Sequence, residues 1–248
     1  MRRTERDNSR TDLAQVLARV PLFSGFAPEE VRALSELAVA RRYAAKQLIL
    51  RQGDPGGALF AIVSGHLKAF TPGVDGHDTL LTIMGPGEVF GEVSLFDGEP
   101  RSASVATLDK AELVVISRES LQPFLLRSPA LAIKLLEVLA RRLRKLSQRS
   151  DDITSLDVSC RLAKALIKLA ATYGEPVAPN ATRIQLKLSQ QELGDLIGAT
   201  RESVNKHLRL WFERGVARKE SGRLLICDRP ALERIAEHTA DEATPSRP

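Results

Sequence analysis

Apolar and polar residues follow three successive patterns along the chain. Between residues 38 and 117, short apolar runs are separated by glycine-rich turns, which is typical of β-strands. Residues 129–156 contain no glycine, and their apolar positions recur at helical spacing. Residues 157–235 combine helical patterns with a strand and a basic hairpin. This order predicts an α+β chain with an N-terminal β-roll, a long helix and a small C-terminal helical domain.

The three patterns also set the expected domain boundaries. The chain of 248 residues is long enough for two modest domains, each with its own core. We expect a disordered tail over residues 1–11, a β-rich domain over 12–128, a long helix over 129–156, a mainly helical domain over 157–235 and a polar tail over 236–248. Within the β-rich domain, helices are expected at 12–19 and 27–37, and strands near 48–50, 58–63, 66–71, 79–84, 103–107 and 112–116. Many short strands with frequent glycine are typical of a jelly roll.

The long helix carries an apolar stripe at heptad spacing. Its members are Leu136, Leu139, Leu143, Leu146 and Ile153, and Ser150 interrupts the series. Because this stripe is longer than a small domain needs for its own core, it indicates a parallel coiled coil and hence a homodimer. The alternative is a single helix that packs on the roll and keeps its basic residues in solvent.

The C-terminal domain has the pattern of a helix-turn-helix. Ser189 and Glu192 form a capping box, Gly198 can end the first helix, and Thr200 can cap the second. The helices would cover residues 192–197 and 201–213, and the second would face inward with Val204, Leu208 and Trp211. Around this motif we expect a helix over 157–173, a loop over 174–180, a strand over 183–188 and a hairpin over 218–227. Such a motif places the first turn of its second helix at base edges in the major groove.

The charge of this region favours DNA as a partner. Between Arg201 and Arg223 there are seven basic and three acidic residues, and the whole chain has a formal net charge of +5. Base edges would be met by Arg201, Glu202, Asn205 and Lys206, and phosphates by Gln190, Gln191, Thr200, Ser203 and Lys219. A surface helical hairpin with a solvated charged face is the alternative, as is a Glu202 that only pairs with Arg201 or caps the helix.

One segment of the β region suits a phosphate attached to a sugar. Residues 90–103 read FGEVSLFDGEPRSA, with backbone amides flanked by glycines. Arg101 supplies a bidentate cationic fork, Ser102 adds a hydroxyl donor, and Glu92 can accept from a sugar hydroxyl. A surface loop with one Glu–Arg ion pair is the alternative.

This segment resembles the cyclic-nucleotide-binding pattern Phe-Gly-Glu-x-Ser/Ala-Leu followed by Pro-Arg-Ser/Thr/Ala-Ala. With the long helix and the helix-turn-helix in this order, the chain resembles the cyclic AMP receptor protein / fumarate–nitrate regulator (Crp/Fnr) family over about residues 13–232. The resemblance implies a cyclic-nucleotide-binding jelly roll, a dimerisation helix and a winged helix-turn-helix. The implied function is a homodimeric transcription regulator whose promoter binding is controlled by a cyclic nucleotide, first of all cyclic AMP. RNA polymerase is an implied further partner.

The resemblance also assigns roles to single residues. Gly91 and Glu92 would bind the ribose 2′-hydroxyl, and Arg101 and Ser102 the cyclic phosphate. The full ligand set would be Gly91, Glu92, Val93, Ser94, Arg101, Ser102 and Ala103, with Arg142 and Ser147 from the long helix. Arg142 would pair with Glu92 or lie in solvent. Leu146 stands where relatives have a hydroxyl that reaches adenine. This leaves open cyclic GMP, cyclic di-GMP, or a ligand-independent regulator whose roll is only a dimerisation scaffold.

By the same resemblance, the Arg-Glu-x-x-x-Lys series that starts at Arg201 suggests half-sites close to TGTGA. Other classes of function lack their motifs. Cys160 and Cys227 are too few and too far apart for a zinc ribbon or an iron–sulfur cluster, and the four histidines are scattered. There is no Walker A loop and no nucleophile elbow. We therefore expect no enzyme, no metal and no cofactor apart from a non-covalent effector. The chain has no membrane-length apolar run or secretory signal, which predicts a cytoplasmic protein without membrane contact.

Overall fold

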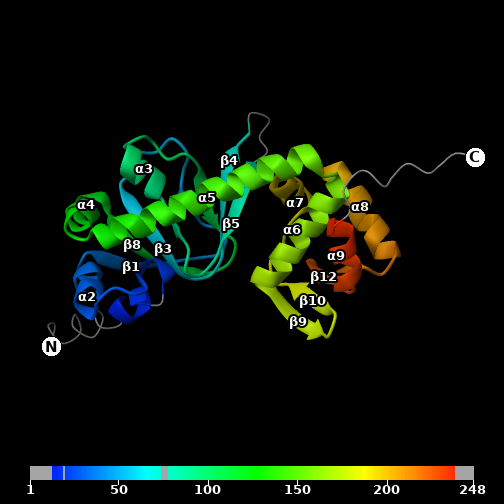
Figure 1. The fold of residues 1–248 in the computed structure, drawn as a ribbon, viewed down its shortest axis with the longest axis horizontal. Coiled ribbons are helices and arrows are strands. Elements are labelled where there is room, and N and C mark those ends of the chain that lie inside the picture. Colours follow the sequence, from blue (N-terminus) through cyan, green and yellow to red (C-terminus); the bar gives the residue numbers. More distant parts are fainter. Residues whose placement is uncertain (1–12, 19, 74–77, 238–248) are drawn as a thin grey trace, which may run out of the picture. The chain divides into compact units, whose positions relative to one another are not determined.

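The computed structural model describes residues 13–18, 20–73 and 78–237. The chain divides into two compact units, residues 1–141 and 142–248, and the division falls inside the long helix α5 (Pro129–Ser155). Figure 1 shows α5 as one unbroken helix. The expected N-terminal tail lies outside the described residues, as does the expected C-terminal tail from residue 238 onward. None of the described helices combines the length and apolar character needed to span a bilayer.

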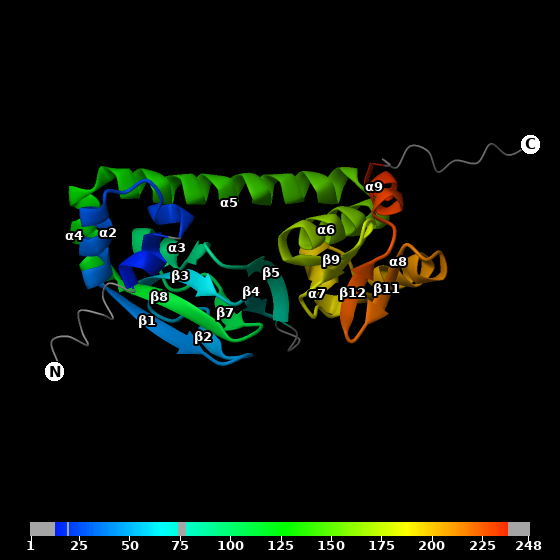
Figure 2. The same ribbon diagram turned by 90° about the horizontal axis from the view of Figure 1, so that it is seen from below.

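The first unit contains two four-stranded antiparallel sheets, seen side-on in Figure 2. One sheet has the order β1 (Ala38–Tyr43), β8 (Ala111–Ser117), β3 (Ala58–Ser64) and β6 (Val89–Phe90). The other has the order β2 (Leu48–Leu50), β7 (Ser104–Thr107), β4 (Leu67–Pro72) and β5 (Asp78–Met84). The expected β-roll is confirmed, with β1 and β6 as strands that the sequence analysis missed.

Strand β3 connects the two apolar clusters of this unit. Leu59 and Ala61 belong to the cluster that includes the N-terminal helices and the start of α5. Phe60 and Ile62 belong to the cluster between the sheets, where Phe60 stacks on Phe90 with ring centroids 4.8 Å apart. Because successive side chains of a strand point to opposite faces, a continuous apolar run can serve both clusters at once.

Short helices complete the first unit. Residues 13–18 are helical, and they are followed by η1 (Pro21–Phe23), α2 (Pro28–Glu36), α3 (Glu92–Asp97) and α4 (Arg118–Arg127). Helix α4 was not expected, although it has an ordinary start signal. Its N-cap Ser117 accepts a hydrogen bond from the backbone nitrogen of Ser120 at 3.2 Å.

The second unit is a helical domain with one small sheet. Its helices are α6 (Val158–Tyr173), α7 (Gln190–Ile197), α8 (Arg201–Glu213) and α9 (Arg229–Glu237). Its sheet has the order β11 (Ala217–Glu220), β12 (Arg223–Ile226), β10 (Ala181–Ile184) and β9 (Gly174–Ala178). Helix α6 packs on α7, α8 and α9 (Figure 1), and the fully buried Leu162, Leu166 and Val204 lie in the core. The hairpin β11–β12 is the wing expected after the helix-turn-helix.

Two expectations for this unit are wrong. The strand predicted over 183–188 is β10, which ends at Ile184, and the predicted loop 174–180 contains strand β9. Strand β9 is an exposed edge strand, so it lacks the alternating pattern from which strands are recognised. Its first residue must be glycine, because a Cβ on Gly174 would lie 2.1 Å from the carbonyl oxygen of Ala170. Helix α7 also starts two residues earlier than predicted, at Gln190.

Candidate functional sites

The side chain of Arg101 is buried in the first unit, with 6% of its surface exposed. Its Nη1 donates to the carbonyl oxygen of Gly91 at 3.0 Å and to Oγ of Ser94 at 2.8 Å, and its Nη2 donates to the carbonyl oxygen of Ala58 at 3.0 Å. Its Nε has no hydrogen-bond partner within the part of the chain that the structure describes. Burial lowers the pKa of this guanidinium from its usual value, and the charge of Glu92 opposes that shift. A buried cation with a spare donor is suited to an anionic ligand.

The backbone around Arg101 is closely packed. Gly91 has φ 84°, and a Cβ there would lie 2.8 Å from both the carbonyl oxygen of Ala58 and Nη1 of Arg101. A Cβ on Gly56 would lie 2.3 Å from Oγ of Ser94. Glycine is therefore required at both positions for the guanidinium and Ser94 to reach their places. The sequence analysis missed Gly56 and Ala58; the signal for them was the glycine-rich turn that precedes β3.

The structure brings four of the predicted ligand residues together: Gly91, Glu92, Ser94 and Arg101. Glu92, completely buried, lies at the start of α3 and is close enough to Arg101 to affect its pKa. Ser94 accepts from Arg101, so its hydroxyl orients the guanidinium. Val93 and Ser102 are exposed, and Ala103 is half-buried. Arg142, half-buried, and Ser147, exposed, belong to the second unit, and their contacts with a nucleotide remain predictions.

The helix-turn-helix of the second unit is built from the predicted local signals. Oγ of Ser189 accepts from the backbone nitrogen of Glu192 at 3.1 Å, and Oε2 of Glu192 accepts from that of Ser189 at 2.9 Å. Gly198 ends α7 with φ 65°, and Oγ1 of Thr200 caps α8 by accepting from the backbone nitrogen of Ser203 at 3.2 Å. The predicted inward residues of α8 are buried: Val204, Leu208 and Trp211.

The outer face of α8 presents charged side chains to solvent. Arg201, Glu202 and Lys206 are exposed, and among the described residues none of the three side chains has a hydrogen bond or an ion pair. The pairing of Glu202 with Arg201 that the sequence left open is therefore not formed. Glu202 and Lys206, four residues apart, lie on the side of the helix away from its buried core face, and Arg201 is the first residue of the helix. This side has the form and charge of a surface that enters the major groove.

Comparison with known proteins assigns both units. Residues 40–128 match the family described as the cyclic nucleotide-binding domain, and residues 160–235 match the Crp-like helix-turn-helix domain. The CRP-like cAMP-activated global transcriptional regulator of Mycobacterium tuberculosis is 37% identical over 222 residues, which is 90% of this chain and 99% of that protein. The chain belongs to the Crp/Fnr family of transcription regulators.

Other Crp/Fnr members are similar over most of the chain. The cyclic AMP receptor protein of Thermus thermophilus is 35% identical over 87% of this chain and 96% of its own. The solved structure of the c-di-GMP responsive global regulator CLP of Xanthomonas campestris has a TM-score of 0.68 and 27% identity, and it covers 81% of this chain and 99% of that one. The expected family and fold class are thereby confirmed.

In this Crp/Fnr regulator, most of the predicted dimer stripe on α5 is open to solvent. The exposed fractions are 60% for Leu136, 66% for Leu143, 62% for Leu146 and 41% for Ile153. Leu139 is half-buried. Ile153 also contacts the helix-turn-helix, because a Cβ on Gly198 would lie 2.7 Å from its Cδ1. The residues that interrupt or flank the stripe are polar, as in Ser150 and Lys145.

The wing carries a second basic surface of the regulator. Glu220, at the end of β11, accepts from Nη2 and Nε of Arg183 at 2.8 and 3.1 Å, and this hydrogen bonding lowers the pKa of Glu220. Arg218 also pairs with Glu220. Lys219 lies between them in sequence, is exposed, and has no ion pair within the described part of the chain. It is therefore available to an anionic partner such as a DNA phosphate.

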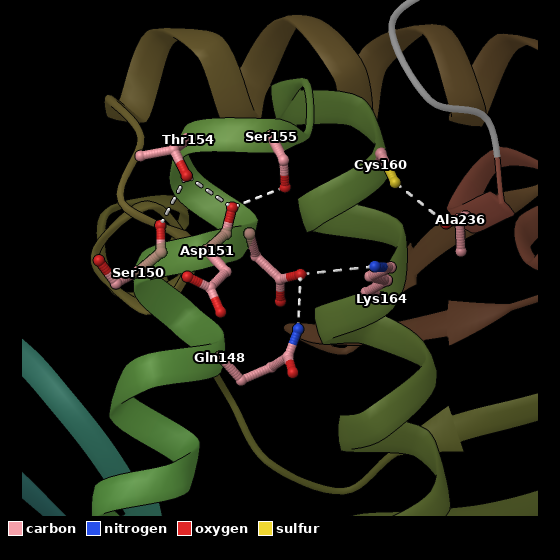
Figure 3. Close-up of polar contacts among 9 residues, drawn as sticks. Gln148, Ser150, Asp151, Thr154, Ser155, Cys160, Lys164 and Ala236 are labelled. Atoms are coloured by element: carbon pink, nitrogen blue, oxygen red, sulfur yellow. Dashed lines mark hydrogen bonds and ion pairs between the residues drawn. The ribbon is translucent and has the colours of Figure 1, made fainter.

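Figure 3 shows the polar contacts at the junction of α5 and α6. Oγ of Ser155 and Oγ1 of Thr154 donate to the carbonyl oxygen of Asp151 at 2.6 and 2.9 Å, within the last turn of α5. Oδ1 of Asp152 accepts from Nζ of Lys164 on α6 at 3.5 Å. Asp157 then caps α6 by accepting from the backbone nitrogen of Cys160 at 2.7 Å. Side-chain hydrogen bonds thus cap the end of α5 and the start of α6.

Proposed function

We propose that this chain is a cytoplasmic homodimer that binds cyclic AMP in its β-roll and, when it does so, binds an inverted-repeat promoter site with its two helix-turn-helix domains. The observation that carries the proposal is the buried Arg101, held beside the buried Glu92 and with a spare Nε donor. A cyclic phosphate would accept from the guanidinium, and the ribose 2′-hydroxyl would donate to the carboxylate. Gly91, Ser102 and Ala103 would contribute backbone or hydroxyl groups nearby.

Two features bear on the identity of the nucleotide. The relatives at 37% and 35% identity are named for activation by cyclic AMP or its reception, whereas the relative at 27% is named for its response to c-di-GMP. These identities favour cyclic AMP. Ser147 also favours cyclic AMP, because its hydroxyl could contact the purine. Leu146 offers no hydroxyl. That apolar residue is the specific observation behind the second candidate, a regulator that binds DNA without a nucleotide.

The dimer is proposed from the apolar stripe on α5. Leu143 and Leu146 each expose more than half of their surface, and a second copy of the same helix would cover them. A two-fold axis along this stripe pairs each position with itself, so the two helix-turn-helix domains would meet the two halves of a palindrome. RNA polymerase is the expected further partner at such a promoter.

Calorimetric titration of the nucleotide-free full chain tests the proposal. Cyclic AMP, cyclic GMP and cyclic di-GMP are titrated separately, and DNA binding to a promoter library is measured with and without each nucleotide. We expect cyclic AMP to bind tightest and to increase specific DNA binding. Equal DNA binding in all conditions, with no heat of nucleotide binding, would instead support the ligand-independent regulator. Tightest binding of cyclic di-GMP would overturn the choice of nucleotide alone.

A further inference from the structure

A hydrogen bond joins the two helices of the helix-turn-helix at their outer surface. Nε2 of Gln190, the first residue of α7, donates to Oδ1 of Asn205 on α8 at 3.1 Å. Asn205 is exposed and Gln190 is half-buried. The neighbouring amide behaves differently, because Nε2 of Gln191 donates to Oδ1 of Asp195 within α7 at 2.8 Å. Of these two adjacent glutamines, Gln190 is the one whose side chain forms a hydrogen bond with α8, the helix that faces DNA in this motif.

Asn205 lies among the side chains that would read bases. It follows Arg201 by four residues, which is about one helical turn, and it immediately precedes Lys206. Arg201 and Lys206 have no partners among the described residues, so their long side chains are held by nothing in the protein. Asn205 differs from both, because its amide is held by a neighbour.

The bond from Gln190 fixes which way the Asn205 amide faces. A free amide can rotate and exchange the positions of its oxygen and nitrogen, whereas the hydrogen bond to Gln190 restrains this rotation, with Oδ1 of Asn205 on the side of Nε2 of Gln190. Oδ1 has two lone pairs, of which Gln190 uses one, and Nδ2 has two hydrogens. The amide can therefore still accept one hydrogen bond and donate another in a single plane. Adenine offers the complementary pair in the major groove, a donor at N6 and an acceptor at N7.

We propose that Gln190 is a positioning residue that orients Asn205 to read one adenine in each half-site, and that Gln190 is not a phosphate contact. The inference rests on the proposed function, since it needs the helix-turn-helix to bind specific DNA. It names the base that the predicted base-reading residue Asn205 would recognise, and it makes the specificity at that base depend on Gln190, a residue of the other helix. Orienting the amide before DNA arrives reduces the ordering that binding must supply.

The test compares base preference in matched variants of the full chain. Binding sites are selected from a random library without nucleotide and with cyclic AMP, cyclic GMP or cyclic di-GMP, and the condition with the tightest binding is used. Affinities are then measured for sites that carry each base pair at every half-site position. The variants are Asn205→Ala, Gln190→Met and the double substitution, with Gln191→Met as the control. Methionine retains the length and helix propensity of glutamine and removes its amide.

We expect the wild type to prefer adenine at one position of each half-site by about tenfold, as a bidentate base contact provides. Asn205→Ala should remove that preference and leave the other positions unchanged. Gln190→Met should weaken the preference at the same position, and the double substitution should add nothing to Asn205→Ala. Gln191→Met, at a predicted phosphate contact, should change the affinity for all sequences alike and leave the base preference intact. Thermal unfolding of all variants should stay close to the wild type, because these side chains are at the surface.

Three results would overturn the inference. Gln190→Met could weaken all sequences alike, which is the behaviour of a phosphate contact. Asn205→Ala could leave every base preference unchanged. The selected half-site could also have no position at which adenine is preferred. In these cases the wild type still selects an inverted repeat, and the proposed function stands. A wild type that selects no inverted repeat in any condition overturns the proposed function as well.

Discussion

At the scale of single residues, Arg101 combines two properties that usually exclude each other, burial and charge. Its Nη1 and Nη2 donate to two carbonyl oxygens and to Ser94, which hold the side chain in place, while its Nε has no partner among the described residues. The arginine itself was predictable from the sequence, because the Pro-Arg-Ser series follows a glycine-flanked carboxylate. Its supports were not. Gly56 and Ala58 come from a different part of the chain, and only the folded roll brings them within reach.

Substitution of Arg101 should therefore act on ligand binding. Arg101→Ala removes a charge-assisted contact worth roughly 1.5–3 kcal/mol, so we expect cyclic AMP affinity to fall by at least about tenfold. Calorimetric titration measures this loss. Arg42→Ala is the control, since Arg42 is an exposed arginine of the same unit whose ion-pair partner among the described residues is Glu112. An Arg101→Ala variant that binds cyclic AMP like the wild type would exclude the guanidinium from the site.

His207 gives a pH dependence at the same scale. Burial lowers the pKa of this half-buried imidazole below its usual value near 6.5; the nearby Lys206 lowers it further, while Asp157 opposes the shift. The folded state therefore binds its proton less readily than the unfolded chain, so stability is present above about pH 6.5 and falls as the pH is lowered. Denaturant unfolding at pH 7.5 and pH 5.5 should show a smaller loss in His207→Asn than in the wild type. Equal losses would contradict this assignment.

At the scale of elements, local signals located the helix-turn-helix but missed the exposed strands. Helix α7 ends at Gly198, and helix α8 is capped at its start by Thr200. Both caps depend on neighbours within a few positions in the sequence. Strands β1 and β9 are mostly exposed and exist because distant segments, β8 and β10, pair with them. β1 contains two adjacent arginines and β9 contains a glycine and a proline, so no alternation of apolar and polar residues marks them. Helix α9, whose one buried residue is Leu232, was missed as well.

The contact between α5 and α7 is also invisible in the sequence. Arg149, whose pKa is lowered by burial, donates to the carbonyl oxygen of Asp195 near the end of α7. Arg149→Met should lower the free energy of unfolding of the second unit by about 1 kcal/mol, because the carbonyl loses a charged donor. Thermal unfolding measures the effect. Lys145→Met, one turn earlier on α5 and exposed, should change little; equal effects of the two substitutions would show that the Arg149 contact is not stabilising.

At the scale of the whole molecule, the exposed stripe on α5 is the basis of the proposed dimer. Leu143 exposes 66% of its surface, although leucine is usually buried, and it lies in the centre of the stripe. Leu143→Lys would place two cations against each other at the two-fold axis of a coiled coil, so we expect the dimer to dissociate. Light scattering gives the mass directly. The control Lys145→Ala lies outside the stripe and should stay dimeric. A Leu143→Lys variant that stays dimeric would show that the dimer interface is not at this stripe.

Binding to DNA joins all three scales, because the proposed dimer would present every contact twice. Lys219, on the wing, should meet a phosphate, so Lys219→Ala should weaken all sequences alike. Each lost phosphate contact changes the slope of log affinity against log salt by about 0.9, and a dimer that loses two should therefore change it by about 1.8.

Arg201, at the start of α8, should instead read a guanine, and Arg201→Ala should cost roughly 1–3 kcal/mol on the specific site and relax one base pair in each half-site. Titrations of both variants at several salt concentrations separate the two roles. A change in slope near 0.9 for Lys219→Ala would indicate that only one protomer binds the DNA through this residue. An Arg201→Ala variant with unchanged base preference would show that Arg201 does not read a base.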